Sequence, residues 1–127
     1  MKHAISIFLA LLFTMCIGCS KQISGNPEQD AQTFIQALIE AAKKNDFEKA
    51  NEITGLYYEY YSNADVVDKT IFLKHINYSE KYLTRGEQVL FEELTNDDRW
   101  EDAPNTIRFR LFAKETENEA RRLGIWE

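Results

Sequence analysis

Apolar side chains recur every three or four residues after residue 26, which is the spacing of one face of an α-helix. Asn26 suits an N-cap, and we expect a helix over 27–44 that ends where Asn45 adopts a left-handed conformation. Asp46 suits the N-cap of a second helix. The two helices are predicted to form a tight αα-hairpin. Their expected inner residues are Ala31, Phe34, Ile35, Leu38, Ala42, Phe47, Ala50, Ile53 and Tyr57.

Two more helices are predicted downstream of this hairpin. For the third, Ser62 suits an N-cap with Asp65 at the third helical position, and the helical pattern continues to Tyr82. Its expected inner face holds Val67, Ile71, His75, Tyr78 and Tyr82, widened by Val66, Phe72, Leu73 and Ile76. Thr84 and Glu87 fit a capping box, which indicates a fourth helix that ends near Asn96.

The C-terminal part admits two interpretations. Residues 96–105 are polar and are expected to form a loop. Residues 106–112 alternate apolar and charged side chains as a strand does, yet a lone strand has no partner for its backbone groups. We therefore favour a helix from Asn105 to Gly124, with Ile125 and Trp126 folded back as an apolar tail. Its expected inner face is Phe109, Phe112, Ala113, Thr116, Ala120 and Leu123.

These patterns predict an all-α fold, a small bundle of about five helices, with residues 26–127 as a single domain. The residues before it have another character. Lys2 gives a positive start, residues 4–17 are uncharged and mostly apolar, and the small Gly18 follows. A helix over residues 4–17 would span about 21 Å, short of a hydrocarbon core about 30 Å thick. We therefore expect residues 1–18 to be a cleaved secretory signal.

The end of this signal resembles the lipobox of bacterial lipoprotein precursors. Cys16-Ile17-Gly18-Cys19 places a small residue before a cysteine, although Cys16 stands where the family usually has an aliphatic residue. The resemblance implies that Cys19 is the lipidated residue, carrying fatty acids such as palmitate after cleavage before it. Two acyl chains hold a protein stably on a membrane. Residues 19–25 would then be the lipidated cysteine and a short tether.

The same resemblance implies a location in the bacterial cell envelope. Ser20 follows the cysteine, and lipoproteins without Asp at this place are usually sent to the outer membrane, facing the periplasm, in bacteria with two membranes. In a cell with one membrane, the anchor implies the outer face of the plasma membrane.

Charge and cysteine content narrow the function classes. The chain has a net charge of −6, and Lys2 is the only charged residue of the signal, so the mature charge would be −7. An acidic domain is unsuited to nucleic acid, which proteins bind largely by neutralising phosphates. Both cysteines lie within the first 19 residues, so a domain over 26–127 has no disulfide and depends on its apolar core.

The sequence contains few residues suited to catalysis or metal binding. His75 is the only histidine beyond the signal, and its apolar neighbours indicate a partly buried core residue. Without another histidine or a cysteine, a zinc site would need three carboxylates. No glycine-rich phosphate loop and no nucleophile elbow occur. We therefore expect a non-enzymatic protein with no metal and no cofactor.

Aromatic residues are the remaining candidates for recognition. Tyr57, Tyr58, Tyr60 and Tyr61 are too closely spaced to share one helix face, and Trp100 lies in the predicted polar loop. Either two tyrosines pack inward and two lie along neighbouring groups, or the cluster forms an aromatic surface for a peptide or glycan. The leading hypothesis is a membrane-anchored domain that uses these five residues to bind another protein of the envelope.

Two further functions are considered. A small acidic lipoprotein is typical of immunity proteins that neutralise a basic toxin. In addition, residues 27–50 faintly resemble the opening of NTF2-like lipoproteins, which implies a curved sheet and a ligand-binding or enzymatic role. A strongly helical structure would count against this resemblance.

Overall fold

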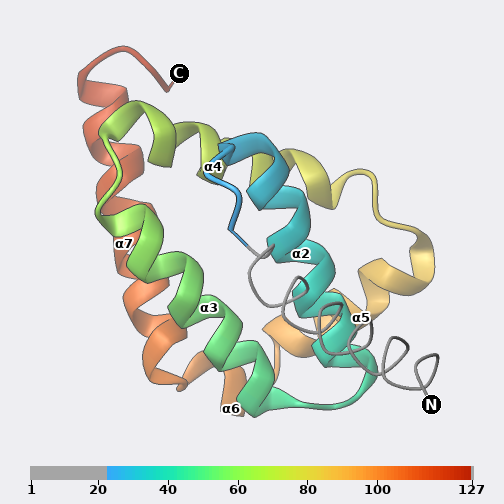
Figure 1. Cartoon of the computed structure of the whole chain (residues 1–127). Coiled ribbons are helices and arrows are strands. Elements are labelled where there is room, and N and C mark those ends of the chain that lie inside the picture. Colours follow the sequence, from blue (N-terminus) through green and yellow to red (C-terminus); the bar gives the residue numbers. More distant parts are fainter. Residues whose placement is uncertain (1–22, 127) are drawn as a thin grey trace, which may run out of the picture.

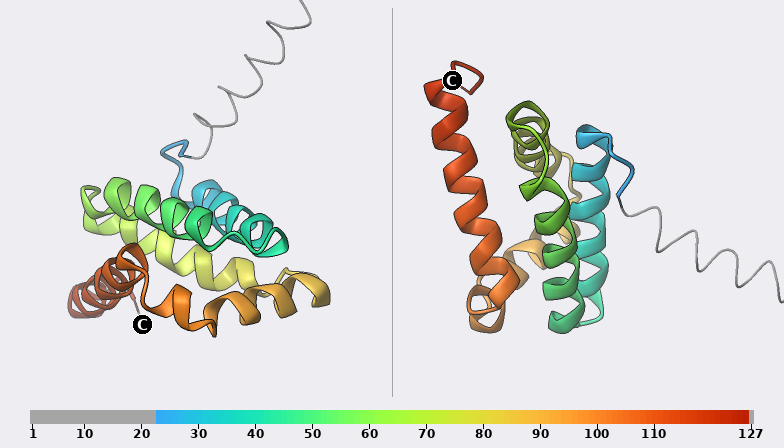
Figure 2. Two further views of the ribbon diagram at one scale, coloured as in Figure 1. Left: turned by 90° about the horizontal axis from the view of Figure 1, so that it is seen from below. Right: turned by 60° about the vertical axis from the view of Figure 1, so that its left-hand side comes forward.

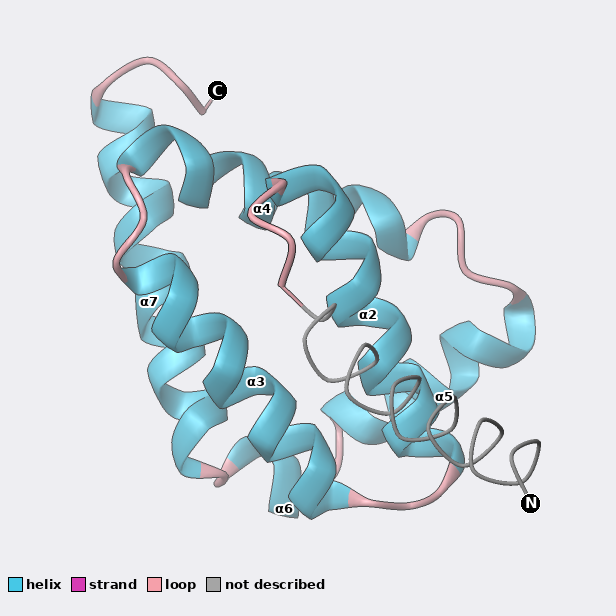
Figure 3. Ribbon diagram, viewed as in Figure 1, coloured by secondary structure: helices cyan, strands magenta, loops and turns pink. Residues whose placement is uncertain are grey.

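The computed structural model describes residues 23–126, and every regular element in this range is an α-helix (Figure 3). The helices are α2 (Pro27–Lys43), α3 (Phe47–Ser62), α4 (Val66–Glu80), α5 (Arg85–Thr95), α6 (Asp98–Glu101) and α7 (Pro104–Arg122). The predicted all-α bundle is confirmed. The curved sheet implied by the NTF2-like resemblance is not found among residues 23–126. The predicted signal peptide and Cys19 lie outside the described residues.

Local capping signals start α2, α3 and α5 as predicted. Helix α4 differs, because its N-cap is Asp65 and not Ser62, and the Asp65 side chain accepts a hydrogen bond from the Asp68 N–H at 2.8 Å. The Asn26 side chain accepts a hydrogen bond from the Gln29 N–H at 3.1 Å, which begins α2. Thr84 and Glu87 make both bonds of the predicted capping box at α5. Asn45 joins α2 to α3 with a φ of +52°, the left-handed conformation expected for it.

Helices α2 and α3 form the predicted hairpin, which lies across α4 (Figures 1 and 2). Helix α2 also packs on α5, and α7 packs on α3 and α4. The short α6 connects α5 with α7 (Figure 1). The apolar core therefore lies between the hairpin and the later helices.

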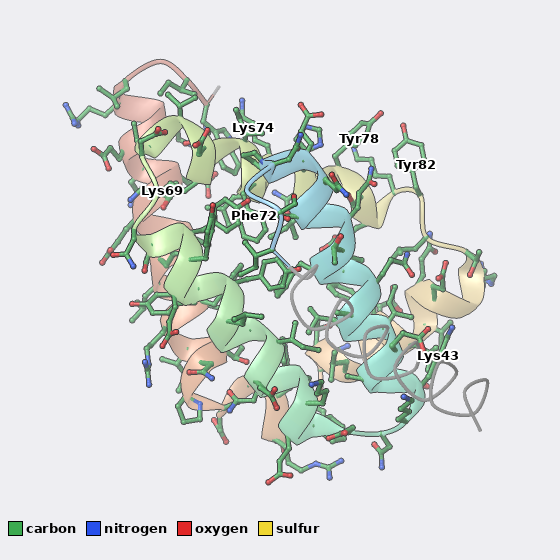
Figure 4. The ribbon with its side chains drawn as sticks, viewed as in Figure 1. Lys43, Lys69, Phe72, Lys74, Tyr78 and Tyr82 are labelled. Carbon is green, nitrogen blue, oxygen red and sulfur yellow. The ribbon has the colours of Figure 1, made fainter. Side chains whose placement is uncertain are left out.

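Aromatic rings fill the centre of this core. Phe72 on α4 is fully buried and stacks on Tyr61 of α3, with ring centroids 3.9 Å apart. Tyr57 stacks on the same ring at 5.8 Å. Phe34 of α2 and Phe109 of α7 stack at 5.3 Å, so rings from four helices meet here. Figure 4 shows Phe72 directed into the space between α2 and α3.

The predicted inner face of α4 was partly wrong. Val67, Tyr78 and Tyr82 are exposed, and α4 ends at Glu80, before Tyr82. The buried face consists of Thr70, Phe72, Leu73, Ile76 and Ser79. The physical reason is that α4 has apolar residues on every side, so periodicity alone leaves its orientation open. Thr70 fits the core because it donates its hydroxyl hydrogen to the backbone carbonyl of Val66.

The C-terminal region is helical, so the strand interpretation of residues 106–112 was wrong. Helix α7 starts at Pro104, two residues earlier than an N-cap at Asn105 requires. The predicted loop over 96–105 was also wrong in part, because α6 lies within it. Of the expected inner face of α7, only Leu123 is exposed. The tail folds back as predicted, with Trp126 partly buried against the core.

A close approach between α3 and α7 explains why residue 55 is a glycine. A β-carbon at Gly55 would overlap the side-chain amide of Asn105. That amide donates a hydrogen bond to the Asn51 carbonyl at 2.9 Å, and the Asn105 N–H donates to the Asn51 side chain at 3.2 Å. Glycine at this position therefore lets α7 begin close against α3.

We expect Gly55→Ala to lower the free energy of unfolding by about 1 kcal/mol, because displacing Asn105 outweighs the gain of roughly 1 kcal/mol in helix propensity. Gly86→Ala is the matched control, because a β-carbon there meets nothing within 4 Å. It should raise stability by about 0.5 kcal/mol. Urea unfolding of both variants measures the difference, and equal stabilisation by the two changes would contradict the proposed overlap.

Candidate functional site

The structure divides the five aromatic residues predicted to bind a partner. Tyr57, Tyr61 and Trp100 are buried, with exposed fractions of 0, 1 and 6%. The prediction that they form a binding surface is therefore wrong for these three, since their rings belong to the core. Tyr58 is partly buried and Tyr60 is exposed. The alternative in which two tyrosines pack inward and two lie along neighbouring groups is confirmed.

Tyr58 lines a groove between α3 and α7. The groove has a volume of about 300 Å³. The Tyr58 ring meets the Phe112 ring edge-on at 5.9 Å, and Leu111 beside it is 57% exposed. Lys69 and Arg108 also line the groove, as do two carboxylates further along α7, Glu115 and Glu119. An exposed apolar side chain between charges of both signs is suited to contact with another protein.

A second feature is a buried carboxylate that holds the segment before α2. Asp30 is 1% exposed. Its Oδ1 accepts bonds from the Ser24 N–H at 2.7 Å and the Ser24 hydroxyl at 2.8 Å, and its Oδ2 accepts from the Gly25 N–H at 3.1 Å. The Tyr61 hydroxyl donates to Oδ2 at 2.5 Å. We call these four residues the Asp30 clamp, which holds the segment before α2 against the first turn of α2 and the last turn of α3. This end of the hairpin lies opposite the turn at Asn45 (Figure 1).

The backbone of the clamp requires a glycine. Gly25 has a φ of +87°, a conformation that other residues rarely adopt. A β-carbon there would also lie 3.2 Å from the Tyr60 hydroxyl oxygen. Gly25 therefore lets the chain turn from Ser24 toward Asn26 while its N–H still reaches Asp30.

The Asp30 clamp was not predicted, although the sequence carried a signal for it. Asp30 stands four residues before Phe34 and eight before Leu38, in line with the apolar face of α2. A carboxylate in such a line must find hydrogen-bond donors, because burying an unpaired charge is costly. The donors come from Ser24 and from Tyr61 on another helix, and the sequence pattern does not reveal that contact.

The buried tyrosines predict a loss of stability at high pH. Burial raises the pKa of the Tyr61 hydroxyl, and the hydrogen bond to Asp30 raises it further. Burial raises the pKa of Tyr57 in the same direction, with a smaller effect of the Asp30 charge. Above about pH 10 the unfolded chain releases these two protons while the folded protein keeps them. Each retained proton then lowers the free energy of unfolding by about 1.4 kcal/mol per pH unit.

We therefore expect a decline of roughly 2.7 kcal/mol per pH unit above pH 10 for these two groups together, and full stability from them below it. Tyr61→Phe should make this slope shallower by about 1.4 kcal/mol per unit. Urea unfolding at pH 9, 10 and 11 measures both slopes. If the free energy of unfolding fell equally steeply with pH in the wild type and in Tyr61→Phe, the assignment of a retained proton to Tyr61 would be wrong.

Another groove lies between α2 and the end of α4, with a volume of about 350 Å³. Its lining includes Gln32, Gln36, Tyr78, Ser79, Tyr82 and Leu83. The sequence patterns assigned Tyr78 and Tyr82 to the core, so this groove was not predicted. Figure 4 shows both tyrosines projecting side by side from the end of α4.

The described residues include few groups suited to catalysis or metal binding. Among residues 23–126, no three histidine, cysteine or acidic side chains are placed to hold a metal ion. His75 is partly buried, and its Nε2 lies 3.5 Å from the Glu28 carboxylate on α2. None of the helices in the described part of the chain has the length and apolar character to cross a membrane.

Comparison with models of known protein families, with curated proteins and with solved structures gave no match. A fold class such as a helical bundle hosts many unrelated functions, so function has to be argued from the sites themselves.

Proposed function

We propose that the protein is a lipid-anchored, non-enzymatic binding protein of the bacterial cell envelope. The observation that carries the proposal is the Asp30 clamp, which fixes Ser24 and Gly25 to the helical body. With Cys19 lipidated, only three residues, 20–22, would separate it from Ile23, whose partly buried side chain packs against the core. A rigid attachment this close to an acylated residue suits a domain that acts next to its membrane.

The length of that tether limits what the domain can reach. Five residue steps separate Cys19 from Ser24, and an extended chain covers at most about 18 Å over that distance. The end of the bundle where α2 begins and α3 ends would therefore face the bilayer. Partners would have to approach the other sides of the bundle.

The groove between α3 and α7 is the proposed binding site for an envelope protein. Leu111 and Ile107 stand one helical turn apart on α7 and are 57 and 47% exposed. Lys69, Arg108 and the two glutamates at the groove allow charge pairing with a partner at its rim. Such a partner would place an apolar side chain beside Tyr58 and opposite charges around it.

The anchor is tested with Cys19→Ala in the bacterium. The unchanged protein should incorporate labelled palmitate and sediment with membranes, and the variant should do neither, because two acyl chains supply the stable attachment. Cys16→Ala is the matched control and should leave labelling intact. Equal labelling of the wild type and of Cys19→Ala would refute the lipoprotein assignment.

The partner site is tested by crosslinking in cells with a photoreactive amino acid at position 111. The same amino acid at position 89 is the control, since Val89 is 46% exposed on α5, outside the groove. We expect a defined envelope protein crosslinked from 111 and absent from 89. Arg108→Glu should weaken that crosslink. A toxin recovered at 111 would instead favour the immunity function, and identical products at both positions would argue against this site.

A further inference from the structure

The groove between α2 and α4 has an uncharged, hydrogen-bonding lining. Gln32 and Gln36 stand four residues apart on α2, so both exposed amides face the groove from one side. Each amide offers a carbonyl acceptor and two N–H donors. No charged side chain belongs to the lining. The groove is therefore built for a ligand that both donates and accepts hydrogen bonds and carries no net charge.

Ser79 supplies an unsatisfied polar group in this groove. Its side chain is 9% exposed, and its Oγ is buried with no hydrogen-bond partner among the described residues. A buried hydroxyl without a partner destabilises the free protein by about 1–3 kcal/mol. If the Ser79 side chain turned toward the groove, a ligand hydroxyl or amide there would supply the missing bond.

Tyr78 and Tyr82 form an aromatic rim over the same space. Their hydroxyls share a hydrogen bond at 2.5 Å, and their ring centroids are 4.9 Å apart at an interplanar angle of 56°. The rings nevertheless remain 49 and 70% exposed. The faces of aromatic rings carry partial negative charge and attract polarised C–H groups. Two rings held at a fixed angle thus offer a stacking surface beside the amides.

We infer that this groove binds a neutral saccharide chain. A sugar ring combines an apolar C–H face for Tyr78 and Tyr82 with hydroxyls for the two glutamine amides and Ser79. A charged ligand would find no counter-charge in the lining. An acyl chain would leave the two glutamine amides and Ser79 without hydrogen-bond partners. A peptide helix needs a longer row of apolar pockets than Leu83 and Ile35 supply. The inference does not depend on the lipid anchor or on the α3–α7 groove.

The test uses the full chain, purified in a detergent without a sugar headgroup. The probes are tetramers of N-acetylglucosamine and of glucose, measured by saturation-transfer NMR and titration calorimetry. We expect at least one tetramer to bind, and Tyr82→Ala and Gln36→Ala to weaken its affinity ten-fold or more. Tyr60→Ala is the matched control, because Tyr60 is 45% exposed outside the groove, and it should leave the affinity unchanged.

Ser79→Ala separates recognition from folding. Removal of an unpaired buried hydroxyl should maintain or raise the melting temperature, while the affinity for the sugar falls several-fold. The inference is overturned if neither tetramer binds at 10 mM, or if Tyr82→Ala binds as well as the wild type. It is also overturned if an uncharged, end-capped tripeptide binds in a Tyr82-dependent way and the sugars do not.

Discussion

Replacing Phe72 with alanine is expected to lower the free energy of unfolding by about 4 kcal/mol. The Phe72 ring is fully buried and stacks on Tyr61 at 3.9 Å and on Tyr57 at 5.8 Å. It also lies 5.9 Å from Phe34 of α2, so its loss opens a cavity where three helices meet. For a domain of this size, the melting temperature should fall by roughly 16–30 °C.

Two comparisons make the Phe72 result interpretable. Phe72→Leu keeps most of the volume and should cost about 1–1.5 kcal/mol. Tyr82→Ala removes an aromatic ring that is 70% exposed and should change stability by less than about 0.5 kcal/mol. Urea unfolding followed by circular dichroism gives all three values. If Phe72→Ala lost no more stability than Phe72→Leu, the central position assigned to this ring would be wrong.

The first residues of α2, α3 and α5 could be predicted because their capping signals are local. The capping side chain of Asn26 and the pair Thr84 and Glu87 act within four residues of the backbone groups they satisfy. Asn45 likewise ends α2 through its own backbone conformation. Such features need no knowledge of the rest of the fold, and the hairpin follows from them directly.

The orientation of α4 could not be predicted in the same way. Helix α4 carries apolar side chains all around its circumference, so several of its faces match a helical period equally well. The face that is buried contains Thr70 and Ser79, which pattern reading treats as outward residues. The orientation of α4 is decided by the stacking of Phe72 on Tyr57 and Tyr61. Both tyrosines belong to α3, so the pattern within α4 does not reveal these contacts. Tyr78 and Tyr82 are exposed as a consequence.

The candidate sites depend on the same non-local contacts. Five aromatic residues were predicted as a surface, and only Tyr58 and Tyr60 are accessible. Sequence spacing shows that four tyrosines cannot share one face, and it does not show which pair faces the core. The groove of Tyr78 and Tyr82 depends further on where α4 ends relative to α2.

The Asp30 clamp connects the core with the proposed function. Tyr61 contacts Phe72 through its ring and Asp30 through its hydroxyl. The clamp that would hold the domain to its tether is therefore part of the aromatic core. Loosening the clamp should disturb both the position of Ser24 and the stability of the bundle.

Asp30→Ala is expected to lower the free energy of unfolding by about 3 kcal/mol, because the buried Tyr61 hydroxyl loses its acceptor and Ser24 and Gly25 lose theirs. Amide hydrogen exchange at Ser24 and Gly25 should become faster in this variant. Tyr61→Phe, the matched change on the other side of the bond, should cost about 1–2 kcal/mol.

Combining the two changes tests whether Asp30 and Tyr61 act as one unit. With Tyr61 already replaced by Phe, removing Asp30 leaves no buried hydroxyl unpaired, so the double variant should cost at least about 1 kcal/mol less than the sum of the single changes. Additive losses in urea unfolding would mean that the two residues stabilise the fold independently. Unchanged exchange at Ser24 and Gly25 in Asp30→Ala would mean that other contacts hold the tether. Either outcome would contradict the role of the Asp30 clamp in holding Ser24 and Gly25 against the bundle.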